Sequence, residues 1–490
     1  MALAPFYSRI FSAVGKHVGV SRDSLSKALG KTRVGIICAK APSQNERIIA
    51  EMSVNLAARL YPSLAISTPD SDLRKQLVML AESINPRIEI SADASPELTV
   101  GIGAAAGERA VYASSSGWVA EVTMEFLNSD GPTNPYSSAA AAALAWSEVF
   151  RRVFLHQSNA HDVRISLLDY GETTGRDLEL DGLSIGDVLF VGVGAVGNAA
   201  IWSMSRDPKT KGRLTLLDHE TLSLSNLQRY VLGTMADIDK PKVNIAAQLL
   251  EGTQFETKVS QITLEEHGVE ATCCPAICIS LDNVGGRRAA QALLPRLIVN
   301  GWTGEGSLGA SWHKFDNGQA CLACLYHPHS EGLSIVQQAA RAFGLKEERA
   351  LQLWLTRAPL DSEERRRAAK KLGVHSSVLA AWREKPIGDL YTDIVCGAVP
   401  IDLPGVQNVE VVPLAHQSVL AGVIMAAELL KRTNESLSTL SQREPLVAWE
   451  DVLRKPPQQW RRPRGREQGC ICGDATYQEV YRAKWNGVSV

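Results

Sequence analysis

Three glycines at a characteristic spacing offer the first chemistry in this sequence. Gly192, Gly194 and Gly197 form the pattern G-x-G-x-x-G within V-G-V-G-A-V-G. Glycines permit a tight turn and a close backbone approach, and a helix that starts here directs free N–H groups and a positive dipole end at a phosphate. The pattern predicts a phosphate-binding loop; the alternative is a packing turn between a strand and a helix that binds no ligand.

A carboxylate and a group of polar side chains follow the glycine loop. Asp218 ends the next expected strand and can accept hydrogen bonds from ribose hydroxyls, as it would in a dinucleotide dehydrogenase. The segments D-H-E-T-L-S-L-S-N-L-Q-R-Y and D-K-P-K-V then place Asn226, Arg229, Lys240 and Lys242 in a polar loop. Several cations near a phosphate site suit a triphosphate whose charge grows on a leaving pyrophosphate. Hydride transfer from a nicotinamide cofactor has no such need.

A second carboxylate closes a later strand in the segment S-L-D-N. The carboxyl ends of parallel strands face the ligand crevice, so Asp282 is placed to hold Mg²⁺ against phosphates. Capping of the helix that follows is the alternative role for Asp282, and the two roles are compatible.

Alternating strands and helices must position these groups. We expect strands over 187–191, 213–218, 276–281 and 296–300, and helices over 195–205, 242–251 and 285–294. This alternation predicts an α/β fold with a doubly wound, mostly parallel sheet.

The rest of the chain divides by composition. We expect a helical lead over 1–32 and a second α/β domain over 33–160, which has no glycine loop and hence no nucleotide site. The domain with the glycine loop is expected over 184–330 and 391–454. It is interrupted by a helical insertion over 331–390, which is rich in Glu, Arg, Lys and Ala. The tail over 455–490 begins with a Pro- and Arg-rich stretch, 455–469, expected to be an exposed connector.

Composition narrows the class of protein. The 490 residues are 45% hydrophobic and 21% charged, with a net charge of -2. These values are typical of a globular protein and give no reason to expect nucleic acid or a membrane surface as a partner. We find no signal peptide and no apolar run long enough to span a bilayer, so we expect a soluble, cytoplasmic protein.

Two close pairs of cysteines predict a metal site. Nine cysteines are too few for a disulfide scaffold of this length. The pairs are Cys321 with Cys324, spaced C-x-x-C, and Cys470 with Cys472, spaced C-x-C. Four thiolates would form a closed, structural zinc site that ties the tail to the domain. His327 or His329 is an alternative ligand, and four unligated thiols are the alternative to a metal site.

The motifs G-V-G-A-V-G, L-D-H-E-T-L-S-L-S-N-L-Q-R, K-P-K and S-L-D-N, in this order, resemble the ThiF/MoeB/ubiquitin-activating enzyme superfamily. The resemblance covers 184–330 and, more weakly, 391–435. It implies Mg·ATP-dependent adenylation of the C-terminal carboxylate of a ubiquitin-like protein. In that case Asp218 binds ribose, Asn226, Arg229 and Lys242 bind phosphates, and Asp282 holds Mg²⁺. Glu220 stands where the family often has Asp.

The resemblance also implies a thiol nucleophile and a partner half. By its order in the chain, Cys396 would attack the adenylate to form a thioester and pass the acyl group to a conjugating enzyme; a small buried residue is the alternative. Residues 33–160 resemble the inactive adenylation half of eukaryotic-type activating enzymes, and a homodimer is an open alternative. The size and insertion are similar to bacterial ubiquitin-like conjugation systems, some linked to anti-phage defence. Sulfur-carrier adenylyltransferase and nicotinamide-dependent oxidoreductase are the competing functions.

Overall fold

The computed structural model describes residues 30, 32–91, 96–107, 109–127, 129–155, 162–304, 306–326, 335–372, 379–380, 382–394, 414–441, 444–452, 456–457 and 459–486. The chain forms two compact units, one of residues 1–327 and 413–490 and one of residues 328–412. The predicted lead over 1–32 lies almost wholly outside the described residues.

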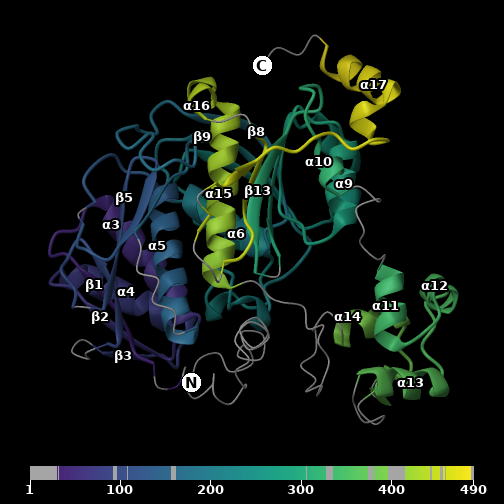
Figure 1. Ribbon diagram of the computed structural model, residues 1–490, viewed down its shortest axis with the longest axis horizontal. Coiled ribbons are helices and arrows are strands. Elements are labelled where there is room, and N and C mark those ends of the chain that lie inside the picture. The colour runs from purple at the N-terminus through teal and green to yellow at the C-terminus, as the bar shows by residue number, and fades with distance from the viewer. Residues whose placement is uncertain are drawn as a thin grey trace. The chain divides into compact units, whose positions relative to one another are not determined.

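The first unit begins with a seven-stranded sheet of order β3-β2-β1-β4-β5-β6-β7 (Figure 1). Strands β1 to β5 run parallel, and β6 and β7 are antiparallel. The strands are β1 Val34–Cys38, β2 Ser63–Ser67, β3 Glu89–Ser91, β4 Leu98–Ile102, β5 Ala110–Ser116, β6 Val119–Thr123 and β7 Val163–Ser166, and the helices are α3 Gln44–Ala58, α4 Ser71–Ile84 and α5 Pro135–Phe150, which continues as a π-helical turn, Arg151–Leu155. The predicted boundary at residue 160 is too early, because β7 completes this sheet.

The second sheet has the order β10-β9-β8-β11-β12-β13-β14-β15. Strands β8 to β12 run parallel, and β13, β14 and β15 are antiparallel. The strands are β8 Ser184–Val191, β9 Lys211–Leu217, β10 Phe255–Ser260, β11 Ala276–Ile279, β12 Leu297–Thr303, β13 Leu308–His313, β14 Leu446–Trp449 and β15 Arg461–Arg462. The helices are α6 Ala195–Met204, α7 Lys242–Leu250, α8 Leu264–His267, α9 Val284–Ala292, α10 Leu322–Leu325, α15 Ala415–Thr433, α16 Glu435–Leu440 and α17 Ala475–Trp485. The predicted α/β class with mostly parallel sheets is confirmed.

The two sheets share one topology. In chain order, the first seven strands of each sheet lie side by side as 3-2-1-4-5-6-7, and only the sixth of these seven runs opposite to the others. In each half a long apolar helix joins the sixth strand to the seventh: α5 in the first half and α15 in the second, where the helical unit is also inserted. The halves are therefore variants of one fold, and only the second has the glycine loop.

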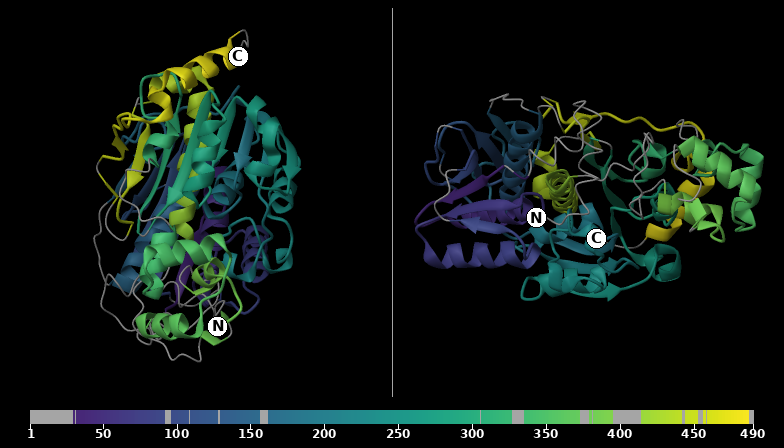
Figure 2. Two further views of the ribbon diagram at one scale, coloured as in Figure 1. Left: turned by 90° about the vertical axis from the view of Figure 1, so that its right-hand side faces the viewer. Right: turned by 90° about the horizontal axis from the view of Figure 1, so that it is seen from below.

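Helices α5 and α15 join the halves. Each packs on its own sheet and on the helix after its own first strand, α3 or α6, and the two pack on each other. Figure 2, right, looks along α15, with the purple and blue first half to its left. All 16 residues of α5 are buried, and its alanine run permits close approach of α15. Asn134 caps α5 by accepting hydrogen bonds from the N–H groups of Tyr136 and Ser137, and Pro135 begins the helix. One apolar cluster extends through both halves.

The second unit is helical, as expected for the insertion. It contains α11 Ile335–Phe343, α12 Glu347–Leu355, α13 Ser362–Leu372 and α14 Ile387–Ile394, which surround an apolar cluster of their own. The predicted end at residue 390 is too early, because α14 continues to Ile394 and Tyr391 belongs to that cluster.

The Pro- and Arg-rich stretch is not wholly exposed, which corrects the prediction of a solvated connector. Arg461 is buried in β15, because the carboxylate of Glu428 on α15 accepts a hydrogen bond from its guanidinium at 2.9 Å. Among the described helices, none combines the length and apolar character needed to cross a membrane.

Candidate functional site

The glycine loop connects β8 to α6, and each glycine meets a different constraint. Gly192 has φ +88°, in the left-handed region that favours glycine. A Cβ on Gly197 would lie 2.1 Å from the carbonyl oxygen of Gly192, so only glycine permits this close packing. Gly194 is the N-cap residue of α6, and a Cβ on it would have no atom within 4 Å. The space beside Gly194 is therefore open to a ligand that approaches the N–H groups of α6.

This loop lies where the strand order of the second sheet reverses. β8 has β9 on one side and β11 on the other, and all three run parallel. The carboxyl ends of such strands form the ligand crevice of doubly wound folds. Asp218, directly after β9, and Asp282, after β11, therefore lie at the same edge of the sheet as the glycine loop.

Two backbone N–H groups donate hydrogen bonds to the Asp218 carboxylate. One carboxylate oxygen accepts a hydrogen bond from Val193 N–H at 2.7 Å, and the other from Glu220 N–H at 2.9 Å. Burial raises the pKa of Asp218, against the opposing effect of the Lys242 ammonium and these N–H groups. Each oxygen can accept a further hydrogen bond, so the carboxylate fits a role in binding ribose hydroxyls.

Lys242 begins α7, and only 3% of its surface is exposed. Its ammonium forms an ion pair with the carboxylate of Glu220, the residue at the position where the family often has Asp. The Glu220 pKa is shifted by two opposed effects: burial would raise it, but Lys242 holds it below its usual value. A phosphate that binds Lys242 must therefore compete with Glu220.

Asn226 and Arg229 lie in the loop between β9 and α7. The Asn226 side chain accepts a hydrogen bond from Ser223 N–H at 3.1 Å, which closes a short 3₁₀ turn over Leu224–Asn226. Arg229 is partly exposed. The Arg229 charge contributes, after that of Lys242, to holding the Glu220 pKa below its usual value. The convergence of Asn226 and Arg229 on phosphates stays a prediction.

Asn198 is a residue that sequence reasoning missed. It is fully buried in the first turn of α6, and its Nδ2 donates to the carbonyl oxygens of Gly194 at 2.7 Å and Ala195 at 2.8 Å. Its Oδ1 accepts from Val231 N–H at 2.7 Å. Asn198 thus connects the glycine loop to the loop that carries Arg229. A lone polar residue in the apolar segment A-V-G-N-A-A-I-W was the available signal.

Asp282 is exposed in the loop between β11 and α9. The helix cap is the neighbouring Asn283, which accepts from Gly286 N–H at 2.6 Å, so the Asp282 carboxylate is not used for capping. This loop is joined to the glycine loop, since Ser280 Oγ donates to the Gly192 carbonyl oxygen at 2.7 Å. Arg287 is buried and donates to the Leu281 carbonyl oxygen, a structural role.

The four predicted zinc ligands come together. The Sγ–Sγ distances are 3.9 Å between Cys321 and Cys324, 3.6 Å between Cys321 and Cys470, and 3.4 Å between Cys324 and Cys472. All four sulfurs lie within 4.8 Å of one another and are buried. Tetrahedral zinc with bonds of about 2.3 Å places its sulfurs about 3.8 Å apart, whereas a disulfide needs about 2.05 Å. Glu467 N–H also donates to Cys324 Sγ at 3.4 Å, as second-shell donors do for thiolates. The set fits a structural Zn²⁺.

The proposed nucleophile Cys396 lies outside the described residues, as do His327 and His329. Cys278 is buried in β11, and burial raises its thiol pKa. Cys274 is half-buried and Cys273 is exposed, so a buried structural role fits Cys278 but not Cys273.

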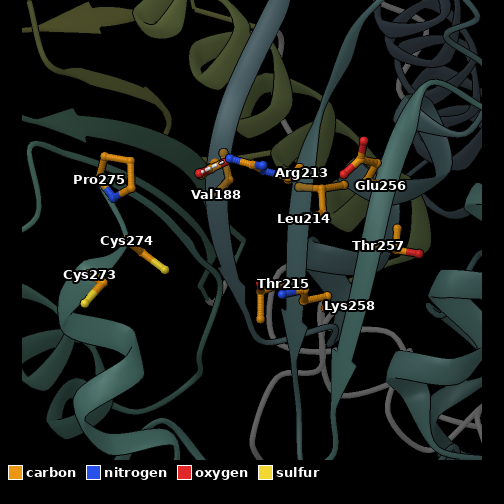
Figure 3. A pocket seen from close by; sticks show the side chains of 11 residues that line it. Val188, Arg213, Leu214, Thr215, Glu256, Thr257, Lys258, Cys273, Cys274 and Pro275 are labelled. Atoms are coloured by element: carbon orange, nitrogen blue, oxygen red, sulfur yellow. Dashed lines mark hydrogen bonds and ion pairs between the residues drawn. The ribbon is translucent and has the colours of Figure 1, made fainter. Parts of the chain in front are cut away.

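An open groove of 460 Å³ lies elsewhere on the second sheet (Figure 3). Its lining comes from the middle of β8, β9 and β10 and from the segment before β11: Asp187, Val188, Arg213, Leu214, Thr215, Glu256, Thr257, Lys258, Cys273, Cys274 and Pro275. None of the predicted nucleotide-binding residues lines it, so it is distinct from the glycine-loop site.

Comparison with known proteins assigns the family. The model of the ThiF family matches residues 172–443, more than half of the 490 residues, and a model described as "Prokaryotic E2 family C" matches 37–155. An uncharacterized protein, y4jF, of Sinorhizobium fredii is 32% identical over 99% of this chain and 98% of its own length. The sulfur carrier protein ThiS adenylyltransferase of Escherichia coli is 30% identical, over 32% of this chain and 65% of its own length.

Among solved structures, E. coli MccB with SeMet MccA matches at 14% identity and a TM-score of 0.36, over 60% of this chain and 68% of that one. Residues 172–443 thus contain a domain of the kind found in named adenylyltransferases. The extent of the ThiF match shows that the chain belongs to the ThiF family.

Proposed function

We propose that this protein uses Mg·ATP to adenylate the C-terminal carboxylate of a ubiquitin-like protein. The observation that carries the proposal is the meeting, at one edge of the second sheet, of the open Gly194 turn, the buried Asp218 and the buried Lys242. A glycine loop alone could bind the phosphates of many different nucleotides. A buried lysine and the N-L-Q-R loop beside it favour a triphosphate over a dinucleotide.

Each residue has a distinct role in this proposal. The Gly192–Gly197 loop and the N-terminus of α6 bind phosphate, Asp218 binds ribose, and Asn226, Arg229 and Lys242 bind the remaining phosphate oxygens. Asp282 would hold Mg²⁺, which when bound neutralises phosphate charge. A carboxylate oxygen of the protein substrate attacks the α-phosphorus, the bond to the β-phosphate oxygen breaks, and pyrophosphate leaves. Lys242 stabilises the charge that develops on pyrophosphate.

The second step needs a thiol. A thiol loses its proton to solvent or a base, and the resulting thiolate attacks the acyl carbon of the adenylate; the bond from this carbon to the AMP oxygen breaks, and AMP leaves with the electron pair. We assign this step to Cys396 by its order in the chain. The first half does not offer an alternative: its sole cysteine in 37–155 is Cys38, which is buried in β1, where burial and Glu46 raise its pKa to about 12. Transfer to a conjugating enzyme, and a role in bacterial anti-phage defence, extend the same proposal.

The first half is proposed to be an inactive adenylation half. Support comes from its shared strand order and from its helix N-terminus, where the N-cap is Ser43 and not an open glycine, and where the Glu46 carboxylate accepts a hydrogen bond from Ser43 N–H. In the same proposal the four clustered cysteines hold a zinc ion, which when bound supplies structural cross-linking between α10 and the tail.

Adenylation of a sulfur-carrier protein is the second candidate, because an E. coli relative is named for that activity. It shares the first step and needs no thioester to Cys396. A nicotinamide-dependent oxidoreductase is the third and has only the glycine loop and Asp218 in its favour.

Pyrophosphate exchange tests the first step. We expect ATP–pyrophosphate exchange that depends on a ubiquitin-like protein with a free C-terminal carboxylate, and loss of exchange in Asp282→Ala. NADH binding without ATP binding would refute the proposal. Full exchange in Asp282→Ala would remove the Mg²⁺ assignment.

Thioester formation tests the second step and separates the first two candidates. We expect a thiol-sensitive adduct with the protein substrate that disappears in Cys396→Ala, with exchange retained. Cys273→Ala, which removes an exposed thiol outside the site, is the matched control. Exchange without any such adduct would favour the sulfur-carrier function.

A further inference from the structure

The inactive half reaches the nucleotide site through one helix, α3. Near its C-terminus, Asn55 Nδ2 donates to the carbonyl oxygen of Val231 at 2.9 Å. One turn later the Arg59 guanidinium donates to the carbonyl oxygens of Leu227 and Gly233. These three acceptors belong to the loop between β9 and α7 that carries Asn226 and Arg229.

Arg59 is committed to this loop. Only 3% of its surface is exposed, and its Nε donates to Asn55 Oδ1 at 2.9 Å. Its guanidinium donates to two carbonyl oxygens and one amide oxygen, and none of these three acceptors is a carboxylate. Burial lowers its pKa to about 9. A guanidinium buried without a carboxylate is costly, and its fork geometry is then used to fix two backbone positions six residues apart.

The same loop is held from its other side by the active half. Asn198 on α6 accepts from Val231 N–H at 2.7 Å, and Asn55 on α3 donates to the carbonyl oxygen of the same residue. The N–H and the carbonyl oxygen of Val231 are thus each bound by an asparagine, one from each half. The loop is tight as well, since a Cβ on Gly233 would lie 2.6 Å from Leu222.

We propose that Asn55 and Arg59 are positioning residues for the phosphate-binding loop, so that the catalytically inactive half completes the nucleotide site within a single chain. This inference rests on the proposed nucleotide function of Asn226 and Arg229. Without the α3 contacts the loop from 227 to 233 would lose its support on one side, and the side chains before and within it would sample positions that do not bind phosphate.

Three variants test this role. Arg59→Met removes the fork and keeps the bulk of the side chain, Arg59→Lys keeps the charge without the fork, and Asn55→Ala removes one hydrogen bond and leaves the guanidinium in place. The matched control is Arg47→Met on the same helix, because Arg47 is paired with Asp70 and does not contact the loop.

We expect Arg59→Met to raise the Kd for MgATP about tenfold and to speed amide exchange in 227–233, with exchange in β1 and β8 unchanged. Arg59→Lys and Asn55→Ala should give intermediate effects, and Arg47→Met none. The KM for ATP should rise while the KM for the protein substrate stays unchanged, a split that general destabilisation would not produce.

The two readouts separate this inference from the proposed function. If wild-type protein binds no ATP, the proposed function fails, while loop exchange in the variants still decides whether α3 anchors the loop. ATP affinity and loop exchange within twofold of wild type in Arg59→Met would overturn the inference. If Arg59→Met does not fold, Asn55→Ala decides by the same criteria.

Discussion

Two glycines of one motif are expected to fail in different ways when changed to alanine. Gly194 has φ −75° and open space at the Cβ position, whereas a Cβ on Gly197 would lie 2.1 Å from the Gly192 carbonyl oxygen and 2.7 Å from Ser280 Oγ. Gly194→Ala should therefore leave the fold intact and fill space needed by the ligand. Gly197→Ala should force the glycine loop away from α6.

The magnitudes follow from these environments. Gly194 is the N-cap of α6 and makes no side-chain cap bond. Because alanine is a poorer N-cap residue than glycine, Gly194→Ala should lower the free energy of unfolding by about 0.5–1 kcal/mol. Overpacking against backbone at Gly197 should lower it by about 1–3 kcal/mol or more. Loss of a close N–H contact to a charged phosphate is worth about 1.5–3 kcal/mol, so Gly194→Ala should weaken ATP binding about 10- to 100-fold.

Thermal denaturation and ATP titration distinguish the outcomes. Gly465→Ala is the control, because Gly465 has open space at its Cβ position and lies in the tail, outside the loop. We expect Gly194→Ala and Gly465→Ala to melt close to wild type, with ATP binding weakened only in the former. Wild-type ATP affinity in Gly194→Ala would refute the argument that phosphate approaches this turn.

Three other perturbations have defined outcomes. Metal analysis should find about one zinc per chain in the wild type and none in Cys470→Ser. Loss of the zinc should detach α17 from the domain while ATP binding persists; a wild type that is as stable without metal as with it would contradict the site. Burial would raise the Glu428 pKa, but Arg461 and neighbouring cations hold it well below 4.5. The stability from this carboxylate is thus present above pH 4.5 and lost as the pH falls below it. Glu428→Gln should therefore cost about 3–5 kcal/mol at pH 7 in urea denaturation and progressively less in acid; a cost independent of pH would contradict this. Glu220→Gln should free Lys242 from its ion pair and tighten ATP binding about two- to fivefold, and weaker binding in a calorimetric titration would show that Glu220 assists the ligand.

The parts of the site that could be predicted from sequence are those encoded locally. The glycine loop, Asp218 and the Asp282 loop each follow a strand within a few residues, and parallel topology brings strand ends to one edge without further information. Cys321 and Cys470 are 149 residues apart in the sequence. The chemistry of the two cysteine pairs alone nevertheless predicted the cluster that the structure contains.

The parts that could not be predicted depend on long-range polar contacts. Asn55 and Arg59 have no motif, because their partners are backbone carbonyl oxygens more than 160 residues away, which have no side-chain signature. The burial of Arg461 was likewise invisible in a Pro- and Arg-rich stretch. Its position depends on Glu428, a buried carboxylate on α15 that lies far from Arg461 in the sequence.

The two halves differ most where their shared fold would bind phosphate. In the first half Ser43 begins a capping box: Ser43 N–H donates to a Glu46 carboxylate oxygen at 2.7 Å, and Glu46 N–H donates to Ser43 Oγ at 3.3 Å. The other Glu46 oxygen accepts from Ser129 N–H at 3.5 Å. A carboxylate of the chain itself therefore takes the helix N-terminus that a phosphate would need, and like charge excludes an anionic ligand.

The same helix contacts the second half at its other end. Its first turn is closed by Glu46, whereas its last turn carries Asn55 and Arg59, which hold the opposite half's loop. Because α5 packs on α3, α15 packs on α6, and α5 and α15 pack on each other, α3 and α6 are fixed relative to each other, and a side chain on α3 can support the site at α6 without moving independently of it. Under the proposed function, a first half without a nucleotide site thus keeps its fold because that fold supports the site of the second half.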